Sequence, residues 1–291
     1  MRIAARLTIG LVFCICTLSF AQPNSPLDTS KIDAALERSG TWTEGVYLVV
    51  FPRSDLRVML QGVHLSVGSL ATFMGTEDRA EMMGEICALP GEVTPSIAKL
   101  RARGVEINSA HNHFLGESPR LTFIHFIARG RAVELARAFR EAVGATSTPI
   151  GKPTALPAAH PEPPWVKVLE KAFGRHGDYS ASDQQLIVDF FRADFPASPM
   201  DFWYQSSLFF QQGRGGNIVG TGDIAVTANE LNQVLTILTE HGFQIEGVHN
   251  HMIDEQPRLF FAHYWKISTP QDLADGLKAA LAVTHTRARA N

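Results

Sequence analysis

Histidine is the residue type that stands out in this sequence: the chain of 291 residues contains 11 histidines, against four tyrosines and three cysteines. The tripeptide His-Asn-His occurs twice, and each occurrence is followed by a third histidine at the same distance. Imidazole is the commonest side-chain ligand for transition metals in proteins. Six histidines in two clusters are therefore candidate metal ligands: His111, His113 and His125, and His249, His251 and His263.

The spacing of these histidines predicts that they converge. Side chains two residues apart on a β-strand point to the same face, so His111 and His113 would share a face, as would His249 and His251. If the chain turns back as a hairpin in a register that places His111 opposite His125, their Cβ atoms lie about 5 Å apart. Three imidazoles arranged in this way form a metal site with open positions for water or substrate. The alternative is a structural role, with the histidines hydrogen-bonded in the core or at the rim of the sheet.

Two carboxylates that each follow a glycine recur near the clusters, Glu85 and Asp223. They are candidates for a catalytic base or for a group that supports a metal ligand. The alternative is a solvated or turn-capping carboxylate. Glu92 and Glu230 each open a predicted helix, where the helix dipole favours negative charge, and we interpret them as structural rather than catalytic.

An arginine follows a proline beside each cluster, at Arg120 and Arg258. A guanidinium at this place could clamp a carboxylate or phosphate group of a substrate. The alternative is a salt bridge to a neighbouring glutamate, Glu117 or Glu255, that holds the turn together. The same two glutamates follow the second histidine of each pair by four residues and are candidates for additional metal ligands.

Motifs for other kinds of chemistry are absent from the sequence. It contains no Gly-x-Ser-x-Gly elbow, no phosphate-binding loop, no His-Glu-x-x-His and no paired Cys-x-x-Cys. The sequence therefore predicts a divalent transition metal (zinc, copper or manganese), and, if the protein is an enzyme, attack of metal-activated water on a small or cell-wall-derived substrate. The alternative is a non-catalytic cell-envelope module that binds a ligand or a partner and whose histidines are structural.

The two clusters belong to an internal repeat. An offset of 138 residues superimposes the His-Asn-His motifs, the Pro-Arg-Leu that follows them, the third histidines and the Gly-Glu/Asp-Ile motifs. Further upstream, Phe-Pro-Arg-Ser-Asp at 51–55 matches Phe-Phe-Arg-Ala-Asp at 190–194 with a small shift. So many matches at one offset indicate a duplication.

The duplication sets the predicted domain organisation. Residues 31–144 and 165–283 form the two copies. The residues 145–164 between them contain six prolines, which predict an extended linker. Within each copy, strand-like apolar runs alternate with amphipathic helices. This order predicts an α+β fold, in which each copy is a mostly antiparallel sheet backed by helices.

The local pattern predicts the elements of the first copy. Two or three short strands are expected between residues 56 and 89, and an amphipathic helix follows that ends at Gly104. A strand that carries His111 and His113 comes next. The chain then turns at 116–119, returns as a strand over 121–127 and ends in a helix over 131–143.

The first 21 residues predict a secretory signal peptide. Arg2 and Arg6 precede an uncharged, mostly apolar stretch over 7–20, and Ala21 ends a small-x-small cleavage pattern. Cleavage there would leave Cys87 as the sole cysteine, which fits a buried apolar residue. We expect a periplasmic or secreted protein with no transmembrane segment after cleavage. A lipid anchor is disfavoured, because bulky residues rather than small ones precede the two cysteines of the leader.

The net charge limits the classes of partner that we expect for this protein. The formal net charge is −3, so the chain has no basic surplus with which to neutralise phosphates. This argues against a general nucleic-acid binder and leaves a small-molecule or cell-envelope ligand as the expected partner.

The repeated motif also carries a resemblance to a known family. The pattern His-Asn-His followed by Pro-Arg-Leu-x-Phe-x-His, strongest over 110–125 and 248–263, resembles the LppY/LpqO family of bacterial exported proteins. The resemblance covers nearly the whole chain after the predicted leader. It implies an exported α+β duplication built on a domain of unknown function, and it implies no established activity.

Overall fold

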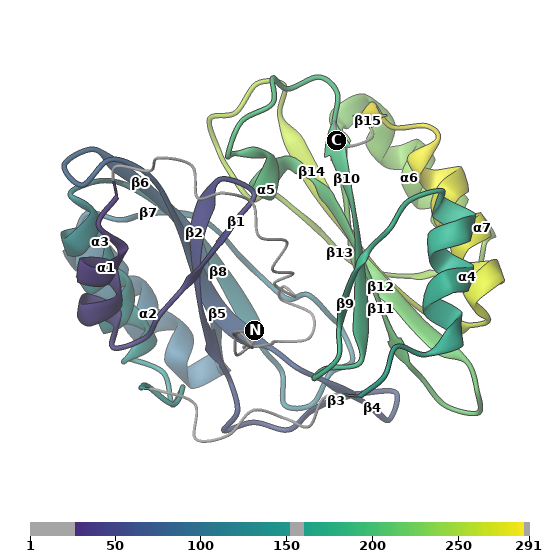
Figure 1. Cartoon of the computed structure of the whole chain (residues 1–291), viewed down its shortest axis with the longest axis horizontal. Coiled ribbons are helices and arrows are strands. Elements are labelled where there is room, and N and C mark those ends of the chain that lie inside the picture. The colour runs from purple at the N-terminus through teal and green to yellow at the C-terminus, as the bar shows by residue number, and fades with distance from the viewer. Residues whose placement is uncertain (1–26, 152–159, 288–291) are drawn as a thin grey trace. The chain divides into compact units, whose positions relative to one another are not determined.

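The computed structural model describes residues 27–151 and 160–287, which divide into two compact units. The first unit runs to Asn112 and resumes at Gly116, and the second contains the C-terminal half together with the segment His113–Leu115. Each unit is an antiparallel sheet with helices on one face (Figure 1), which confirms the predicted α+β class. The predicted signal peptide, residues 1–21, lies outside the described residues, as do residues 152–159 of the predicted linker.

The first unit is built around one main sheet with the strand order β1-β2-β5-β6-β8-β7, and β3 pairs with β4 as a separate hairpin. Its elements are α1 (Thr29–Leu36), β1 (Thr41–Thr43), β2 (Val46–Pro52), β3 (Val58–Leu60), β4 (Val63–Leu65), β5 (Gly68–Gly75), β6 (Ala80–Ala88), α2 (Pro90–Ala102), β7 (Glu106–His111), β8 (Thr122–Gly130) and α3 (Ala132–Val143). The region 56–89 therefore holds four strands rather than the two or three expected. The three-residue strands β3 and β4 are too short to show an alternating pattern.

The second unit repeats this plan with the strand order β13-β14-β12-β11-β10-β15, and β9 also pairs with β10. Its elements are α4 (Pro164–Phe173), β9 (Asp178–Ser180), β10 (Gln185–Arg192), α5 (Asp201–Tyr204), β11 (Ser206–Gln212), β12 (Ile218–Thr227), α6 (Ala228–Glu240), β13 (Gln244–His249), β14 (Leu259–Ser268), α7 (Pro270–Leu281) and β15 (Thr286–Arg287). The short helix α5 occupies the place in the chain that the β3–β4 hairpin has in the first copy.

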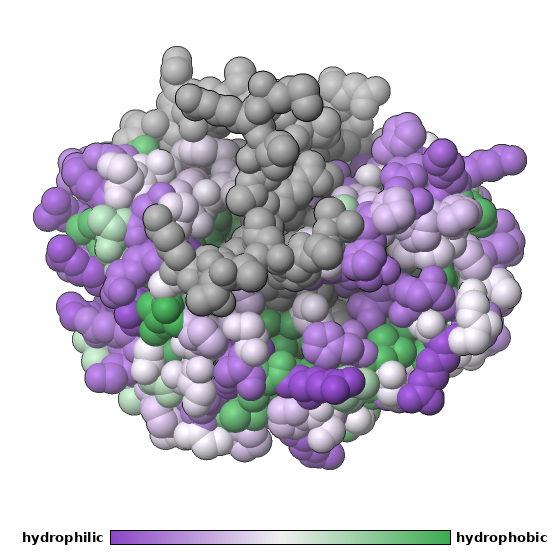
Figure 2. All heavy atoms as spheres, turned by 60° about the horizontal axis from the view of Figure 1, so that its bottom comes forward, coloured by the Kyte–Doolittle hydropathy of each residue, from purple (hydrophilic) through white to green (hydrophobic). Residues whose placement is uncertain are grey.

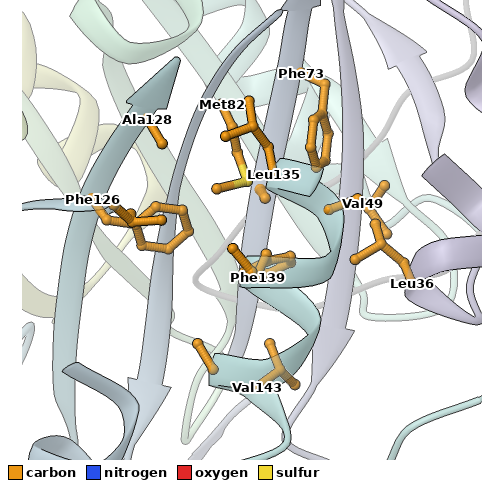
Figure 3. Packing of buried hydrophobic residues seen from close by; sticks show 14 of the residues in the cluster. Leu36, Val49, Phe73, Met82, Phe126, Ala128, Leu135, Phe139 and Val143 are labelled. Carbon is orange, nitrogen blue, oxygen red and sulfur yellow. The ribbon is translucent and has the colours of Figure 1, made fainter. Parts of the chain in front are cut away.

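The core of each unit lies between the sheet and its helices. In the first unit, α3 turns Leu135 and Phe139 toward the sheet, where they meet side chains such as Phe126 (Figure 3). Because Ile124 and Phe126 of β8 belong to this core, the residue between them faces the other side of the sheet. Cys87 is a buried free cysteine, as expected.

The surface carries no extended apolar region in the view of Figure 2, where hydrophilic residues predominate among the coloured atoms and apolar residues form small separate spots. Large hydrophobic side chains that are exposed lie at scattered positions: Leu115, Val168, Val248 and Ile253. Within the described ranges, none of the helices combines the length and the apolar character needed to cross a membrane.

A buried arginine ties the sheet to a helix start in each unit. In the second unit, the guanidinium of Arg192 is fully buried and lies 2.7 Å from Glu230 and 2.5 Å from Asp194. Glu230 also accepts hydrogen bonds from the backbone N–H groups of Thr227, at the start of α6, and of His285, at 2.7 and 2.8 Å. The carboxylate thus caps the helix and fixes the segment that follows α7, which confirms its structural interpretation.

The first unit contains the same arrangement. Arg53 lies 2.9 Å from Asp55 and 2.7 Å from Glu92, and Glu92 accepts from the N–H groups of Leu89 and Ser147. Both arginines belong to the upstream motif that the repeat comparison matched, although the sequence did not indicate their role. We refer to these two sets, Arg53–Asp55–Glu92 and Arg192–Asp194–Glu230, as the arginine clamps.

Because of the arginine clamps, we expect the free energy of unfolding to fall in acid. Burial would raise the pKa of Glu230, but Arg192 and the N–H donors outweigh it, and the pKa lies below its ordinary value of 4.5. A carboxyl whose pKa is lowered by folding stabilises the fold above its unfolded-state pKa, and this stabilisation is lost as the pH falls through the folded-state pKa. The free energy of unfolding should therefore fall as the pH drops below about 4.5, and less steeply in Glu230→Gln. Urea unfolding at a series of pH values measures both slopes, and equal slopes would contradict the prediction.

Candidate metal centre

In the second unit, three neighbouring strands bring one carboxylate and two imidazoles to the same face of the sheet. Asp223 on β12 pairs directly with His263 on β14. His249, the last residue of β13, pairs with Phe261, two residues before His263. Because Tyr264 of β14 belongs to the core under the helices, its neighbour His263 faces the opposite side.

The side chains of Asp223, His249 and His263 are close enough to hold one ion. A potential ligand atom of each lies within 4.8 Å of the others. The Nε2 atoms of the two imidazoles are 2.8 Å apart, and Oδ1 of Asp223 lies 2.6 Å from Nδ1 of His263. Both imidazoles are buried. A carboxylate on one nitrogen of a histidine fixes the proton there and directs the lone pair of the other nitrogen toward a metal.

His251 does not join this ligand set. The strand ends at His249, so the prediction that one strand carries both histidines of the motif is wrong, and alternation does not determine the direction of His251. Its Nδ1 lies 3.4 Å from the carbonyl oxygen of Trp203, and its ring stacks on Phe261 with centroids 3.6 Å apart. Burial lowers the pKa of His251 to about 4, although the charge of Asp223 acts to raise it. His251 is therefore a neutral ring at pH 7, packed beside the site.

In the first unit, the residue equivalent to His263 lies beside each of the other two in turn. Glu85 on β6 pairs directly with His125 on β8, and its Oε2 lies 3.5 Å from Nε2 of His125. The rings of His111 and His125 are parallel, with centroids 5.0 Å apart, and ligand atoms of these two histidines lie within 4.8 Å of each other. Glu85 and His125 are buried, and His111 is partly exposed. Glu85 and Asp223 thus stand beside a histidine in both copies.

The register in the first unit differs from the predicted one. His111 pairs with Phe123 rather than with His125, and a bulge between Ile107 and Ser109 shifts β7. The observed pairing of His111 differs from the predicted one by two residues, so His111 and His125 still share a face. The chain between the strands is a ten-residue loop rather than a tight hairpin turn, because β7 ends at His111 and β8 begins at Thr122.

His113 falls outside the strand that was expected to carry it, because β7 ends at His111. It lies beyond β7, and the segment His113–Leu115 groups with the second unit, so the first unit by itself contains His111 and His125 of the predicted three. The sequence could not indicate this division, since the two histidines of the motif are two residues apart.

The glutamates and arginines of the following loop take part mainly in local structure. Oε1 of Glu117 accepts from the N–H of Leu121, and Oε1 of Glu255 accepts from the N–H of Leu259, both at 2.9 Å. In the second unit, Nε of Arg258 lies 3.2 Å from Glu255, which is the salt bridge considered as an alternative to an anion clamp. Arg120, by contrast, is exposed.

The fold and the site define the class: a tandem α+β protein with a histidine–carboxylate cluster in each copy. The chain belongs to the family of the Domain of Unknown Function (DUF1259), which matches residues 30–145 and 167–283. None of the curated proteins matches this chain.

Two solved structures show a distant likeness. EtuB from Clostridium kluyveri is 12% identical over 84% of this chain and 90% of its own, with a TM-score of 0.21. A trimeric bacterial microcompartment shell protein, PduB, is 11% identical over 86% of this chain and 91% of its own, with a TM-score of 0.24. At such TM-scores the likeness carries no argument about fold or function.

Proposed function

We propose that this is an exported protein that binds a divalent transition metal ion in each copy. The observation that carries the proposal is the convergence of Asp223, His249 and His263, whose ligand atoms lie within 4.8 Å of one another. In the first copy, His125 lies beside both His111 and Glu85, and these three residues are the proposed corresponding site. Zinc, copper and manganese all accept imidazole and carboxylate ligands, and such a site leaves positions for water or substrate.

The chemistry that such an ion supplies is the activation of a bound water for hydrolysis. The substrate class in this proposal is a small or cell-wall-derived molecule, and Arg120 is the exposed cation that could meet an anionic group on it. The predicted leader and the likeness to the LppY/LpqO family support a periplasmic or secreted location.

A second candidate is a non-catalytic envelope module whose histidines are structural. The contact of 2.8 Å between the Nε2 atoms of His249 and His263 favours it, because one imidazole can donate to the other without an ion. The metal content of the purified protein distinguishes the two candidates, because only the first requires a bound ion.

The test uses the chain from residue 22, purified without a histidine tag, loaded separately with zinc, copper or manganese, and dialysed before elemental analysis. We expect about two ions per chain for at least one metal, and a thermal shift on loading. The double variant His125→Ala/His263→Ala should lose most of the bound metal. The control is His176→Ala, which removes an exposed histidine on a loop. Negligible metal in the wild type, with no thermal shift, would establish the second candidate instead.

A further inference from the structure

We propose that the two copies use their carboxylates differently: Glu85 is a direct ligand of the ion in the first copy, whereas Asp223 only orients His263 in the second. This inference rests on the proposed function and adds the ligand set and the metal preference of each site. It starts from one shared feature, since Glu85 pairs with His125 as Asp223 pairs with His263.

The distance in the first copy fits two ligands of one ion. Two ligand atoms that each lie about 2.1 Å from a tetrahedral ion are roughly 3.4 Å apart. Oε2 of Glu85 and Nε2 of His125 are 3.5 Å apart, and both are atoms that bind metals. An ion bound to Nε2 of His125 can therefore bind the carboxylate without rearrangement of the strands.

The carboxylate in the second copy contacts the other ring nitrogen instead. Oδ1 of Asp223 lies 2.6 Å from Nδ1 of His263, an ion-pair contact with the nitrogen that does not face His249. The carboxylate, together with the carbonyl oxygen of Gly222 3.3 Å from Nδ1, then holds the proton on Nδ1 and leaves the lone pair of His263 on Nε2, the atom that faces His249. The second site therefore consists of two nitrogens with the carboxylate outside the coordination sphere.

The length of the acidic side chain explains the difference. The strand register is the same in both copies, and glutamate is one methylene longer than aspartate. The longer side chain of Glu85 reaches Nε2 of its histidine, whereas the shorter side chain of Asp223 reaches Nδ1.

The other histidine of each pair is oriented alike in both copies. Nδ1 of His111 lies 3.2 Å from the carbonyl oxygen of Asn112, and Nδ1 of His249 lies 3.4 Å from that of Asn250. A proton held on Nδ1 by a carbonyl places the lone pair on Nε2. The asparagine between the two histidines of the motif thus supplies the same backbone support to both sites, and only the carboxylate distinguishes them.

The ligand sets predict different metal preferences. Carboxylate oxygen is a hard ligand that suits manganese, whereas imidazole nitrogens suit zinc and copper. The first site, with two nitrogens and one oxygen, should therefore bind manganese better relative to zinc than the second site, with two nitrogens.

The test isolates each site in the chain from residue 22. His263→Ala leaves the first site, and His125→Ala leaves the second. Manganese affinity is measured by electron paramagnetic resonance and zinc affinity by competition with a chromophoric chelator. In the His263→Ala background, Glu85→Gln should lower manganese affinity more than about 100-fold, whereas in the His125→Ala background Asp223→Asn should lower zinc affinity about 10–100-fold, as expected for a supporting carboxylate.

Reciprocal changes of length provide the matched control, because they keep the charge. In the isolated second site, Asp223→Glu should raise the affinity for manganese relative to zinc, and Glu85→Asp should lower this ratio in the isolated first site. Circular dichroism checks that each variant is folded. Equal manganese-to-zinc ratios in the two isolated sites, unchanged by the reciprocal variants, would overturn the inference while leaving metal binding intact. Absence of metal from the wild type would overturn the proposed function itself.

Discussion

Replacing Arg192 with alanine should lower the free energy of unfolding by about 3–5 kcal/mol, the usual cost of removing one partner from a buried ion pair. The guanidinium is fully buried, and its partners Glu230 and Asp194 are 9% and 20% exposed. The substitution would leave both carboxylates without their cation and leave the carbonyl of Ala225 without this donor. Urea denaturation followed by circular dichroism measures the loss.

The control for this prediction is an ion pair at the surface. Arg103 and Glu141 are 45% and 40% exposed, so Arg103→Ala should cost no more than about 1 kcal/mol. Arg53→Ala, in the equivalent clamp of the first unit, should resemble Arg192→Ala. A cost for Arg192→Ala as small as that for Arg103→Ala would show that the clamp does not stabilise the fold.

Replacing Gly222 with alanine should also destabilise the protein strongly, by about 3 kcal/mol or more. A Cβ atom at this position would lie 2.0 Å from the carbonyl oxygen of Ser207 on the neighbouring strand. In addition, the backbone at Gly222 has a φ of +136°, a conformation that residues with a Cβ atom rarely adopt. The strand must therefore move, and it carries Asp223 at the next position. We expect a lower free energy of unfolding in urea together with weaker metal binding.

Two further glycines test this explanation. Gly84 is the equivalent position in the first copy, where a Cβ would lie 2.4 Å from the carbonyl oxygen of Leu70, so Gly84→Ala should also be destabilising. Gly91, in the first turn of α2, has open space around its Cβ position, and Gly91→Ala should be neutral or stabilising by up to about 1 kcal/mol. If Gly222→Ala were as stable as Gly91→Ala, the close approach of the strands would not be the reason for the glycine in the repeated motif.

Sequence patterns within short segments were sufficient to predict the features of the fold that depend on residues close together in the chain. The helix predicted to end at Gly104 is α2, which begins at Pro90 and ends at Ala102, two residues before the glycine, whose φ is +75°. The duplication and the mostly antiparallel sheets also followed from periodicity and from one repeated offset. These features can be predicted from the sequence because the 3.6-residue period of a helix and the two-residue period of a strand appear within a run of consecutive residues.

Contacts between residues far apart in the sequence could not be predicted in this way. Arg53 meets Glu92 from 39 positions away, and nothing in the spacing of the two indicates that they pair. The predicted pairing of His111 differs from the observed one by two residues, because a ten-residue loop, rather than a tight turn, joins the two strands and sets their register.

The sequence by itself determined that two histidine clusters exist, that each is repeated with a nearby carboxylate, and that both lie on an antiparallel sheet. The tertiary structure decided which of these side chains meet. It ended the strands at His111 and His249 and placed Glu85 and Asp223 on different nitrogens of equivalent histidines. The physical reason is that residue types are set one position at a time, whereas contact between ligand atoms depends on strand register and side-chain reach, which packing fixes across the whole sheet.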